Sequence, residues 1–377
     1  MNFELTDERQ MLQDSLRRYL SDTVTPELLH KATEAGSGHS DTLWQGLSEM
    51  GVSGALFSED DGGFGGTGFD LSVVFEEMGR VGAFEPLIES GILAGGLIAA
   101  LGSDAQKALI EEIVAGGTIL TLAHGEPGSR YDLAHVETQA TATDDGYTLS
   151  GRKSLVMAAS AASHAVVSAR TSGDRRDAAG ISLFLVPLDA DGLEIRDYPM
   201  NGGGRAAELA LTDVTLPADA RIGPEGDAHA ALETAQARAI CAQCAEAVGL
   251  MDAIKDLTVG YLQQRRQFGQ PIGKFQALQH RMADLLIEIE QARSAVINLA
   301  GHLEAPRTDR ERHVSAAKNL VGRTAKLVVE ESIQMHGGIG MTMEYALGHL
   351  AKRLTMIDHR FGDADWHLER FIRLAAA

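Results

Sequence analysis

The order of apolar and polar positions in roughly the first 115 residues is typical of α-helices. Apolar residues recur there at spacings of three and four, as they do from Met11 to Leu20. Thr6 stands where the N-cap of that helix is expected. Ser103 and Gln106 form a capping-box pattern before a later helix, and Gly116-Gly117 would end it. The pattern predicts a helical N-terminal domain over residues 1–117.

The pattern changes near Thr118, where short alternating or β-branched segments begin, separated by turn residues. Six such segments lie at 118–124, 136–143, 146–157, 164–170, 180–188 and 207–216. They predict a middle β-domain over 118–226, built as a barrel or a sandwich. From Ala228 the helical period returns, and long amphipathic stretches over 228–264, 274–303 and 310–335 predict an antiparallel four-helix bundle over 227–377. The predicted fold class is therefore α+β, in the order α, β, α.

Composition narrows the possible functions. The chain has 377 residues, 44% of them hydrophobic, which is enough for a sizeable core. Its formal net charge of -20, without a basic run, argues against a nucleic-acid binder. No run approaches the roughly 18 apolar residues of a membrane span, and the polar N-terminus has no apolar signal region. We therefore expect a cytoplasmic protein that binds neither nucleic acid nor membrane.

The stretch CAQCAEAVG, from Cys241 to Gly249, contains the only two cysteines. A redox C-x-x-C motif lowers its thiol pKa at a helix N-terminus, but this one lies deep inside a predicted helix. Zinc would need further ligands, and none is nearby in the sequence, so no metal site is predicted. Both Cys241 and Cys244 are expected to be buried packing residues. Glu246 has two readings: an ion pair with a neighbouring helix, or a general base of raised pKa in a poorly solvated slot.

Two further motifs suggest ligand contacts. RRQFGQPIGKFQALQHRMAD, from Arg265 to Asp284, joins paired arginines, which suit phosphates, to an aromatic residue and two turns. QMHGGIGMTMEY, from Gln334 to Tyr345, places glycines at a helix end, where a ligand can approach the backbone closely. Each also has a purely structural explanation, as a helix–helix corner and a glycine helix cap.

Together these motifs resemble the acyl-CoA dehydrogenase family. EDDGGFGG, FEEMG, HGEPG and GRK match in the same order, so the resemblance covers nearly the whole chain. The tail from Gly337 is most similar to the small subunits of heteromeric dehydrogenases of the pimeloyl-CoA and steroid side-chain type. The resemblance implies FAD as cofactor and α,β-dehydrogenation of an acyl-CoA thioester to the 2-enoyl-CoA. Electrons would pass to an electron-transfer flavoprotein or a similar acceptor.

The resemblance also implies site residues. Arg265 matches a diphosphate-binding arginine, Phe268 and Gln276 match adenosine-side contacts, and the family's Q-x-x-G-G falls on Gln334, Gly337 and Gly338. In family members these residues reach the FAD of a neighbouring subunit. An oligomer is therefore implied, either a homo-tetramer or a heterotetramer with a larger dehydrogenase subunit.

On the flavin-ring side the sequence departs from the family. The usual G-S-D reads Arg130-Tyr131-Asp132, and the common W-x-T reads Leu155-Val156-Met157. Methionine cannot donate a hydrogen bond to a flavin as threonine does.

The catalytic glutamate of the family aligns with Phe361, and its alternative position aligns with about Ala239. Glu246 is the predicted base if this chain is catalytic by itself, with Asp363 a weaker second. If the chain is the small subunit of a heteromer, the partner holds the base and Glu246 is structural. Two other functions stay open: a flavin oxidase or monooxygenase on the same fold, and a non-catalytic structural subunit.

Overall fold

The computed structural model describes residues 5–342 and 344–376. These residues divide into two compact units. The helical unit contains the chain up to Pro26, Thr67–Ala83, and the chain from Ile240 onward. The sheet unit contains Glu27–Gly66 and Phe84–Ala239. The described N-terminal residues are therefore shared between the two units.

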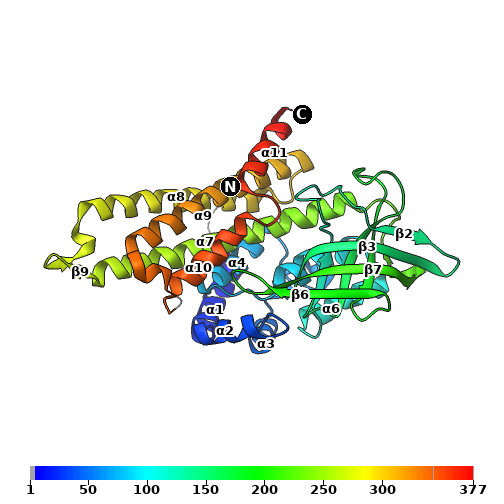
Figure 1. The fold of residues 1–377 in the computed structure, drawn as a ribbon, viewed down its shortest axis with the longest axis horizontal. Helices are drawn as coiled ribbons and strands as arrows, with labels where there is room; N and C mark the ends of the chain where they lie inside the picture. The colour runs from blue at the N-terminus through cyan, green and yellow to red at the C-terminus, as the bar shows by residue number, and fades with distance from the viewer. Residues whose placement is uncertain (1–4, 343, 377) are drawn as a thin grey trace. The chain divides into compact units, whose positions relative to one another are not determined.

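Long helices build the helical unit, in which α8 and α9 pack along each other (Figure 1). It contains α1 and α4 and most of α7, followed by α8 to α11, with bounds Asp7–Thr23, Gly68–Val81, His229–Gln264, Gln276–His302, Arg307–His336, Ala346–Asp358 and Ala364–Ala376. The three long stretches predicted from 228, 274 and 310 are confirmed as α7, α8 and α9. The predicted N-cap of α1 is also confirmed, since the Thr6 hydroxyl accepts a hydrogen bond from the Arg9 N–H.

Strands β1 to β8 form one sheet in the second unit, in the order β6-β7-β3-β2-β4-β5-β8, with β1 pairing parallel to β4. Their bounds are Leu120–Ala123, Gln139–Ala142, Gly146–Met157, His164–Arg170, Ile181–Pro187, Leu193–Pro199, Arg205–Pro217 and Arg221–Ile222. The six predicted segments are confirmed as β1 to β5 and β7. The sequence reading missed β6 and β8. The helices of this unit are α2 (Pro26–Glu34), α3 (Asp41–Glu49), α5 (Gly96–Leu101) and α6 (Asp104–Val114), with a π-helix over Ile88–Gly95.

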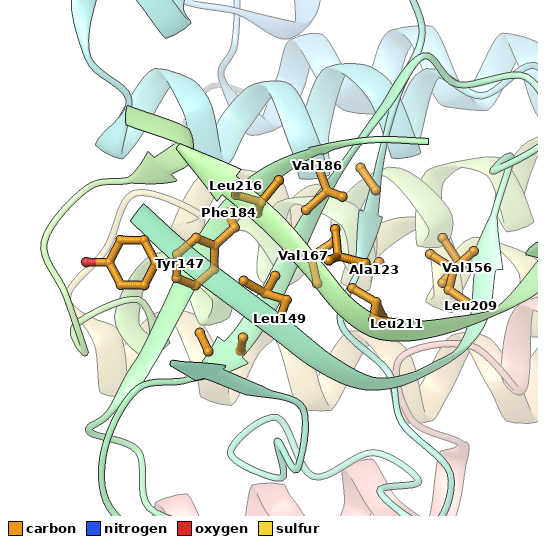
Figure 2. Close-up of a cluster of buried hydrophobic side chains, with 14 of the residues drawn as sticks. Ala123, Tyr147, Leu149, Val156, Val167, Phe184, Val186, Leu209, Leu211 and Leu216 are labelled. Carbon is orange, nitrogen blue, oxygen red and sulfur yellow. The ribbon is translucent and has the colours of Figure 1, made fainter. Parts of the chain in front are cut away.

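Side chains alternate between inward and outward positions along the strands, and the inward ones form the core of the sheet unit (Figure 2). Inward side chains of the paired strands β3 and β7, among them Leu149 and Leu211, are buried in one cluster. The rings of Tyr147 and Phe184 meet edge to face, with centroids 4.9 Å apart. Around the sheet, the predicted capping box of α6 forms between Ser103 and Gln106.

Close contact between α4 and α7 organises the helical unit. A Cβ atom on Gly249 would lie 2.0 Å from the Glu76 carbonyl oxygen, and one on Gly79 would lie 2.1 Å from the Glu246 carbonyl oxygen. Real Cβ contacts are never this short, so the two backbones touch only because both residues are glycine.

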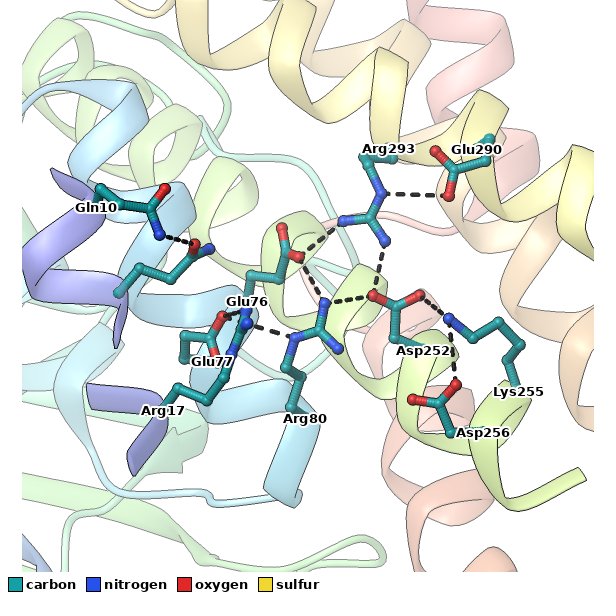
Figure 3. Close-up of polar contacts among 11 residues, drawn as sticks. Gln10, Arg17, Glu76, Glu77, Arg80, Asp252, Lys255, Asp256, Glu290 and Arg293 are labelled. Atoms are coloured by element: carbon teal, nitrogen blue, oxygen red, sulfur yellow. Dashed lines mark hydrogen bonds and ion pairs between the residues drawn. The ribbon is translucent and has the colours of Figure 1, made fainter. Parts of the chain in front are cut away.

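An ion-pair network continues this contact and joins α1, α4, α7 and α8 (Figure 3). The carboxylate of Asp252 is 2% exposed and lies 2.6 Å from Arg80 and 2.7 Å from Arg293, with Lys255 at 3.1 Å. Burial alone would raise the pKa of Asp252. Arg293 and the other cations outweigh burial and hold that pKa below its ordinary value.

Among the described residues, no helix is both long and apolar enough to cross a membrane. The cytoplasmic location stays a prediction.

Gly249→Ala should destabilise the protein by about 3 kcal/mol, because the new methyl group forces α4 and α7 apart. The matched control is Gly260→Ala in the same helix, where a Cβ meets nothing within 4 Å. The control should be neutral or stabilising, since alanine favours helix more than glycine does. Denaturant unfolding of both variants measures the difference, and equal stabilities would contradict the crossing.

Asp252→Asn should lower the free energy of unfolding near neutral pH, and this loss should shrink progressively as the pH falls below about 4. A carboxyl whose pKa is lowered by folding stabilises the folded state fully above its unfolded pKa of about 3.9, and that contribution is lost only as the pH falls through the lower pKa of the folded protein. Urea unfolding of wild type and variant, in steps from about pH 7 down to the lowest pH at which the wild type still folds, measures this. A difference that stays constant with pH would contradict it.

Candidate functional site

A cavity of about 700 Å³ lies in the helical unit along the C-terminal half of α7. Its lining includes Asp256, Gly260, Tyr261 and Arg265 on one side and Ile339 and Tyr345 on the other. The volume falls within the range of about 300–1,000 Å³ that is usual for small-molecule sites. Among the features described here, this cavity is the best candidate for ligand binding.

Arg265 follows the last residue of α7 and lines the cavity. The chain then forms a short hairpin of β9 (Arg266–Gln267) and β10 (Gln270–Pro271). Its two turn residues, Phe268 and Gly269, have φ of 52° and 80°, as a type I′ turn requires. Phe268 is 90% exposed. Gln276 begins α8 and is also exposed, so of these three predicted residues only Arg265 belongs to the cavity lining.

The Q-x-x-G-G residues lie at the end of α9. Gln334 is exposed on its last turn, and Gly337, with φ of 66°, ends the helix. A Cβ on Gly337 or Gly338 would meet nothing within 4 Å, so this backbone is open to approach. The next residue, Ile339, lines the cavity. The ligand roles of Gln334, Gly337 and Gly338 stay predictions.

Glu246 is 4% exposed on α7, and its carboxylate forms an ion pair with Arg353 of α10. Gly249, one turn further along the same face of α7, admits the backbone of α4. Of the two alternatives for Glu246, the structure contains the ion pair with a neighbouring helix. Its catalytic role stays a prediction.

The two cysteines are confirmed as packing residues. Cys241 and Cys244 are both fully buried, and burial raises the pKa of Cys244 to about 12. A thiol with that pKa is neither a useful nucleophile nor a ready metal ligand. Among the residues described, no group of three or more His, Cys, Asp or Glu side chains is placed to hold a metal ion.

The turn that contains Phe361 is firmly held between α10 and α11. Phe361 has φ of 60°, and its carbonyl oxygen accepts a hydrogen bond from His367 Nε2 at 3.0 Å. The ammonium of Lys318, fully buried on α9, donates to the Ile357 carbonyl. The Asp363 carboxylate accepts from the Trp366 N–H at 2.8 Å, as a helix cap does. The turn therefore presents a phenylalanine in a fixed, left-handed conformation.

In the sheet unit, the residues that replace the flavin-side motifs also adopt left-handed conformations. Arg130 has φ of 45° and Leu155 has φ of 55°, with the Leu155 side chain 47% exposed. The Leu155 N–H donates to Glu208 Oε1 at 3.3 Å. The Met157 carbonyl accepts from the Thr121 hydroxyl at 2.6 Å. Leu155 and Met157 offer no side-chain hydroxyl for a flavin ring, whereas Tyr131 keeps a hydroxyl where the family has serine.

The sequence reading did not identify the buried Glu126–Lys153 ion pair, at 2.6 Å, in the matched HGEPG and GRK motifs. The Glu126 carboxylate also accepts from the N–H groups of Glu137 and Thr138, so it closes the loop over 126–138. Burial lowers the pKa of Lys153 to about 8 although Glu126 opposes the shift. The signal available in the sequence was Lys153, a charged residue at an inward position of the strand pattern.

Two cavity residues, Gly260 and Tyr261, were also missed, and their only signal was an isolated glycine inside a helical pattern. Tyr345 lies at the end of the motif QMHGGIGMTMEY but was given no role of its own.

Comparison with known proteins gives one consistent result. The acyl-CoA dehydrogenase N-terminal, middle and C-terminal domain models match residues 6–117, 121–214 and 229–373. The probable acyl-CoA dehydrogenase YngJ of Bacillus subtilis is 30% identical over 99% of this chain and 98% of its own length.

Two solved structures are similar over nearly the whole chain. The Tcur3481-Tcur3483 steroid ACAD variant is 31% identical with a TM-score of 0.87, covering 98% of each chain. The ChsE4-ChsE5 complex from Mycobacterium tuberculosis is 25% identical with a TM-score of 0.89, covering 100% of this chain and 99% of that one.

Removing either partner of the Glu246–Arg353 pair should cost about 3 kcal/mol of stability, because the remaining charge is buried without its counter-ion. Glu246→Gln, Arg353→Met and the double variant form a cycle that isolates the coupling. We expect the double variant to lose clearly less stability than the two single variants lose together. Additive losses would show that the two side chains do not depend on each other.

Proposed function

Because the chain belongs to the acyl-CoA dehydrogenase family, we propose that it is the small subunit of a heteromer that oxidises an acyl-CoA thioester. The family members are oxidoreductases that convert an acyl-CoA to its 2-enoyl-CoA, and all three of their domains are present. In this heteromer, this chain would supply contacts to the ADP half of FAD, and the larger subunit would supply the base.

The residues of this chain fit the two halves of FAD to different degrees. When bound, FAD would act as the hydride acceptor. On the ADP side, Arg265 offers a guanidinium for a diphosphate beside a cavity, and Gly337 and Gly338 offer open backbone. On the flavin-ring side, Leu155 and Met157 offer no side-chain donor. The residues present fit the ADP half, whereas the W-x-T position, Leu155 to Met157, has lost the hydroxyl that would hold a flavin ring.

The Glu246–Arg353 ion pair is the observation that carries the proposal. α-Proton abstraction needs a carboxylate that is free to take a proton at the pH of the reaction. The Glu246 carboxylate is instead held by Arg353, and Glu246 is not among the residues that line the cavity. At the turn between α10 and α11, Phe361 cannot take a proton at all. This arrangement supports a base on another subunit.

The relatives support a heteromer as well, since two of the similar structures are named as pairs of different chains. The acyl group, the larger subunit and an acceptor of the electron-transfer flavoprotein type belong to the proposal by this analogy.

The proposal is tested by assaying the chain alone and after reconstitution with a larger dehydrogenase subunit, using acyl-CoA and an artificial electron acceptor. We expect no turnover from the chain alone. In the reconstituted complex, Glu246→Gln should leave kcat within about threefold, because the base lies elsewhere.

Arg265→Gln is the control from the ADP side, and it should weaken FAD binding by the complex. Turnover by the chain alone, abolished in Glu246→Gln, would overturn the proposal and identify Glu246 as the base of a homo-oligomer.

A further inference from the structure

Two imidazole rings meet where the chain turns from α8 into α9. His302 is the last residue of α8, and His313 lies in the second turn of α9. Their rings stack with centroids 3.8 Å apart and an interplanar angle of 23°. Neither ring lines the cavity beside α7. The stack bridges the end of one helix and the start of the next, and residues 298–313 are called the α8–α9 joint below.

Asn298, one turn before His302, contacts both rings. The His302 Nδ1 lies 2.7 Å from the Asn298 carbonyl oxygen, to which it must donate. The side-chain amide nitrogen of Asn298 lies 3.3 Å from the His313 Nδ1. An amide nitrogen can only donate, so this nitrogen of His313 accepts the hydrogen bond and carries no proton. The hydrogen bond therefore exists only while His313 is neutral.

The stacking of the rings also favours the neutral state. Two protonated imidazoles 3.8 Å apart would be like charges at close range, so the charge of one ring opposes protonation of the other. His313 is partly buried as well. Burial, followed by the charge of His302, lowers the pKa of His313.

The charged neighbours of His313 on its own helix act in opposite directions. Asp309, about one turn before His313, raises the pKa of His313, and the adjacent Arg312 lowers it. The Arg312 guanidinium lies over the Phe371 ring of α11, 5.8 Å from the ring centroid. Burial and two cationic groups thus outweigh one carboxylate at His313.

The other carboxylates around the joint are held by arginines or lie in the connecting turn. Glu311 of α9 is 2% exposed and is bound by Arg370 of α11 at 2.7 Å. On α4, which packs against α8, Asp70 is bound by Arg9 at 2.7 Å. Glu304, in the turn between α8 and α9, is exposed. Asp309 is therefore the carboxylate that acts on His313.

We propose that the stacked His302–His313 pair makes the α8–α9 joint sensitive to pH. While both rings are neutral, their stack and the hydrogen bond from Asn298 hold the end of α8 against the start of α9. When the pair takes up protons in mildly acidic solution, the rings repel each other, the hydrogen bond from Asn298 is lost and the joint opens locally.

The sign of the pH effect follows from proton binding. A histidine whose pKa is lowered by folding binds fewer protons in the folded state than in the unfolded state. The joint therefore keeps its full stability above the ordinary histidine pKa of about 6.5 and loses it as the pH falls from there through the lower pKa of the folded protein.

The test compares amide hydrogen exchange of the full chain at about pH 7.5 and about pH 5.5, expressed as protection factors, which remove the intrinsic pH dependence of exchange. In wild type, protection of residues 299–312 should fall about threefold or more at the lower pH, while α7 keeps its protection. His313→Phe keeps an aromatic ring in the stack but cannot take up a proton, so protection of its joint should change much less. His280→Gln, which removes an exposed histidine elsewhere on α8, is the matched control and should behave like wild type.

NMR titration of the histidine rings tests the coupling between the two imidazoles. His302→Gln and His313→Gln identify the two signals. In wild type, His313 should titrate below the ordinary pKa of about 6.5, and in His302→Gln its pKa should rise toward that value, because the neighbouring charge is gone.

Equal protection of the joint at both pH values in wild type would overturn the proposal, and so would an equal fall in wild type and His313→Phe. A titration of His313 that His302→Gln leaves unchanged would show that the two rings do not sense each other. A loss of protection that spreads equally to α7 would assign the pH effect to global unfolding and would also overturn the joint.

Discussion

The contact between α4 and α7 at Gly79 and Gly249 is the constraint on which the helical unit depends. Two helix backbones can touch only where neither has a side chain, so the crossing point is fixed to within one residue on each helix. One turn beyond Gly249, Asp252 uses its buried carboxylate to bind Arg80 of α4 and Arg293 of α8. The close backbone contact and the buried ion pairs thus stabilise the same crossing.

The candidate site residues on α7 lie on both sides of this crossing. On one side of Gly249 lies Glu246, whose carbonyl oxygen contacts Gly79 and whose carboxylate pairs with Arg353. On the other side, about three to four and a half turns further on, lie Gly260, Tyr261 and Arg265 along the cavity. A straight helix clamped at one point holds the rest of its length in a fixed direction. The ion pair and the cavity are therefore two consequences of one packing arrangement.

The sequence predicted what depends on neighbours along the chain. Thr6 caps α1 and Ser103 caps α6 through contacts only three residues long, and both were predicted. Strand β6 was missed because LEIRDYP exposes most of its side chains and is recognised as a strand only through its pairing with β7. The local sequence pattern does not determine which strands pair.

The candidate site shows the same division. Arg265 and the glycines at the end of α9 were predicted through motif resemblance, because their order in the chain is what the motif records. The partner of Glu246 was not predicted, because Arg353 is more than a hundred residues away in the sequence. Gly249 and Gly260 look alike as isolated glycines in one helical pattern. Only the structure separates the glycine that another helix requires from the glycine that nothing in this chain requires.

In the proposed heteromer, the difference between the ADP-side and the flavin-side residues has a physical explanation. Diphosphate recognition needs a few donors, and a guanidinium beside a cavity, such as that of Arg265, provides several of them. A reacting flavin needs a base, donors and a dry cleft aligned to a fraction of an ångström. A subunit that supplies only the first set is free to replace its base with Phe361 and to bind Glu246 in an ion pair. The rigid turn at Phe361 and the buried Glu246–Arg353 pair are stable arrangements of this kind, since neither has to change its charge or position during a reaction.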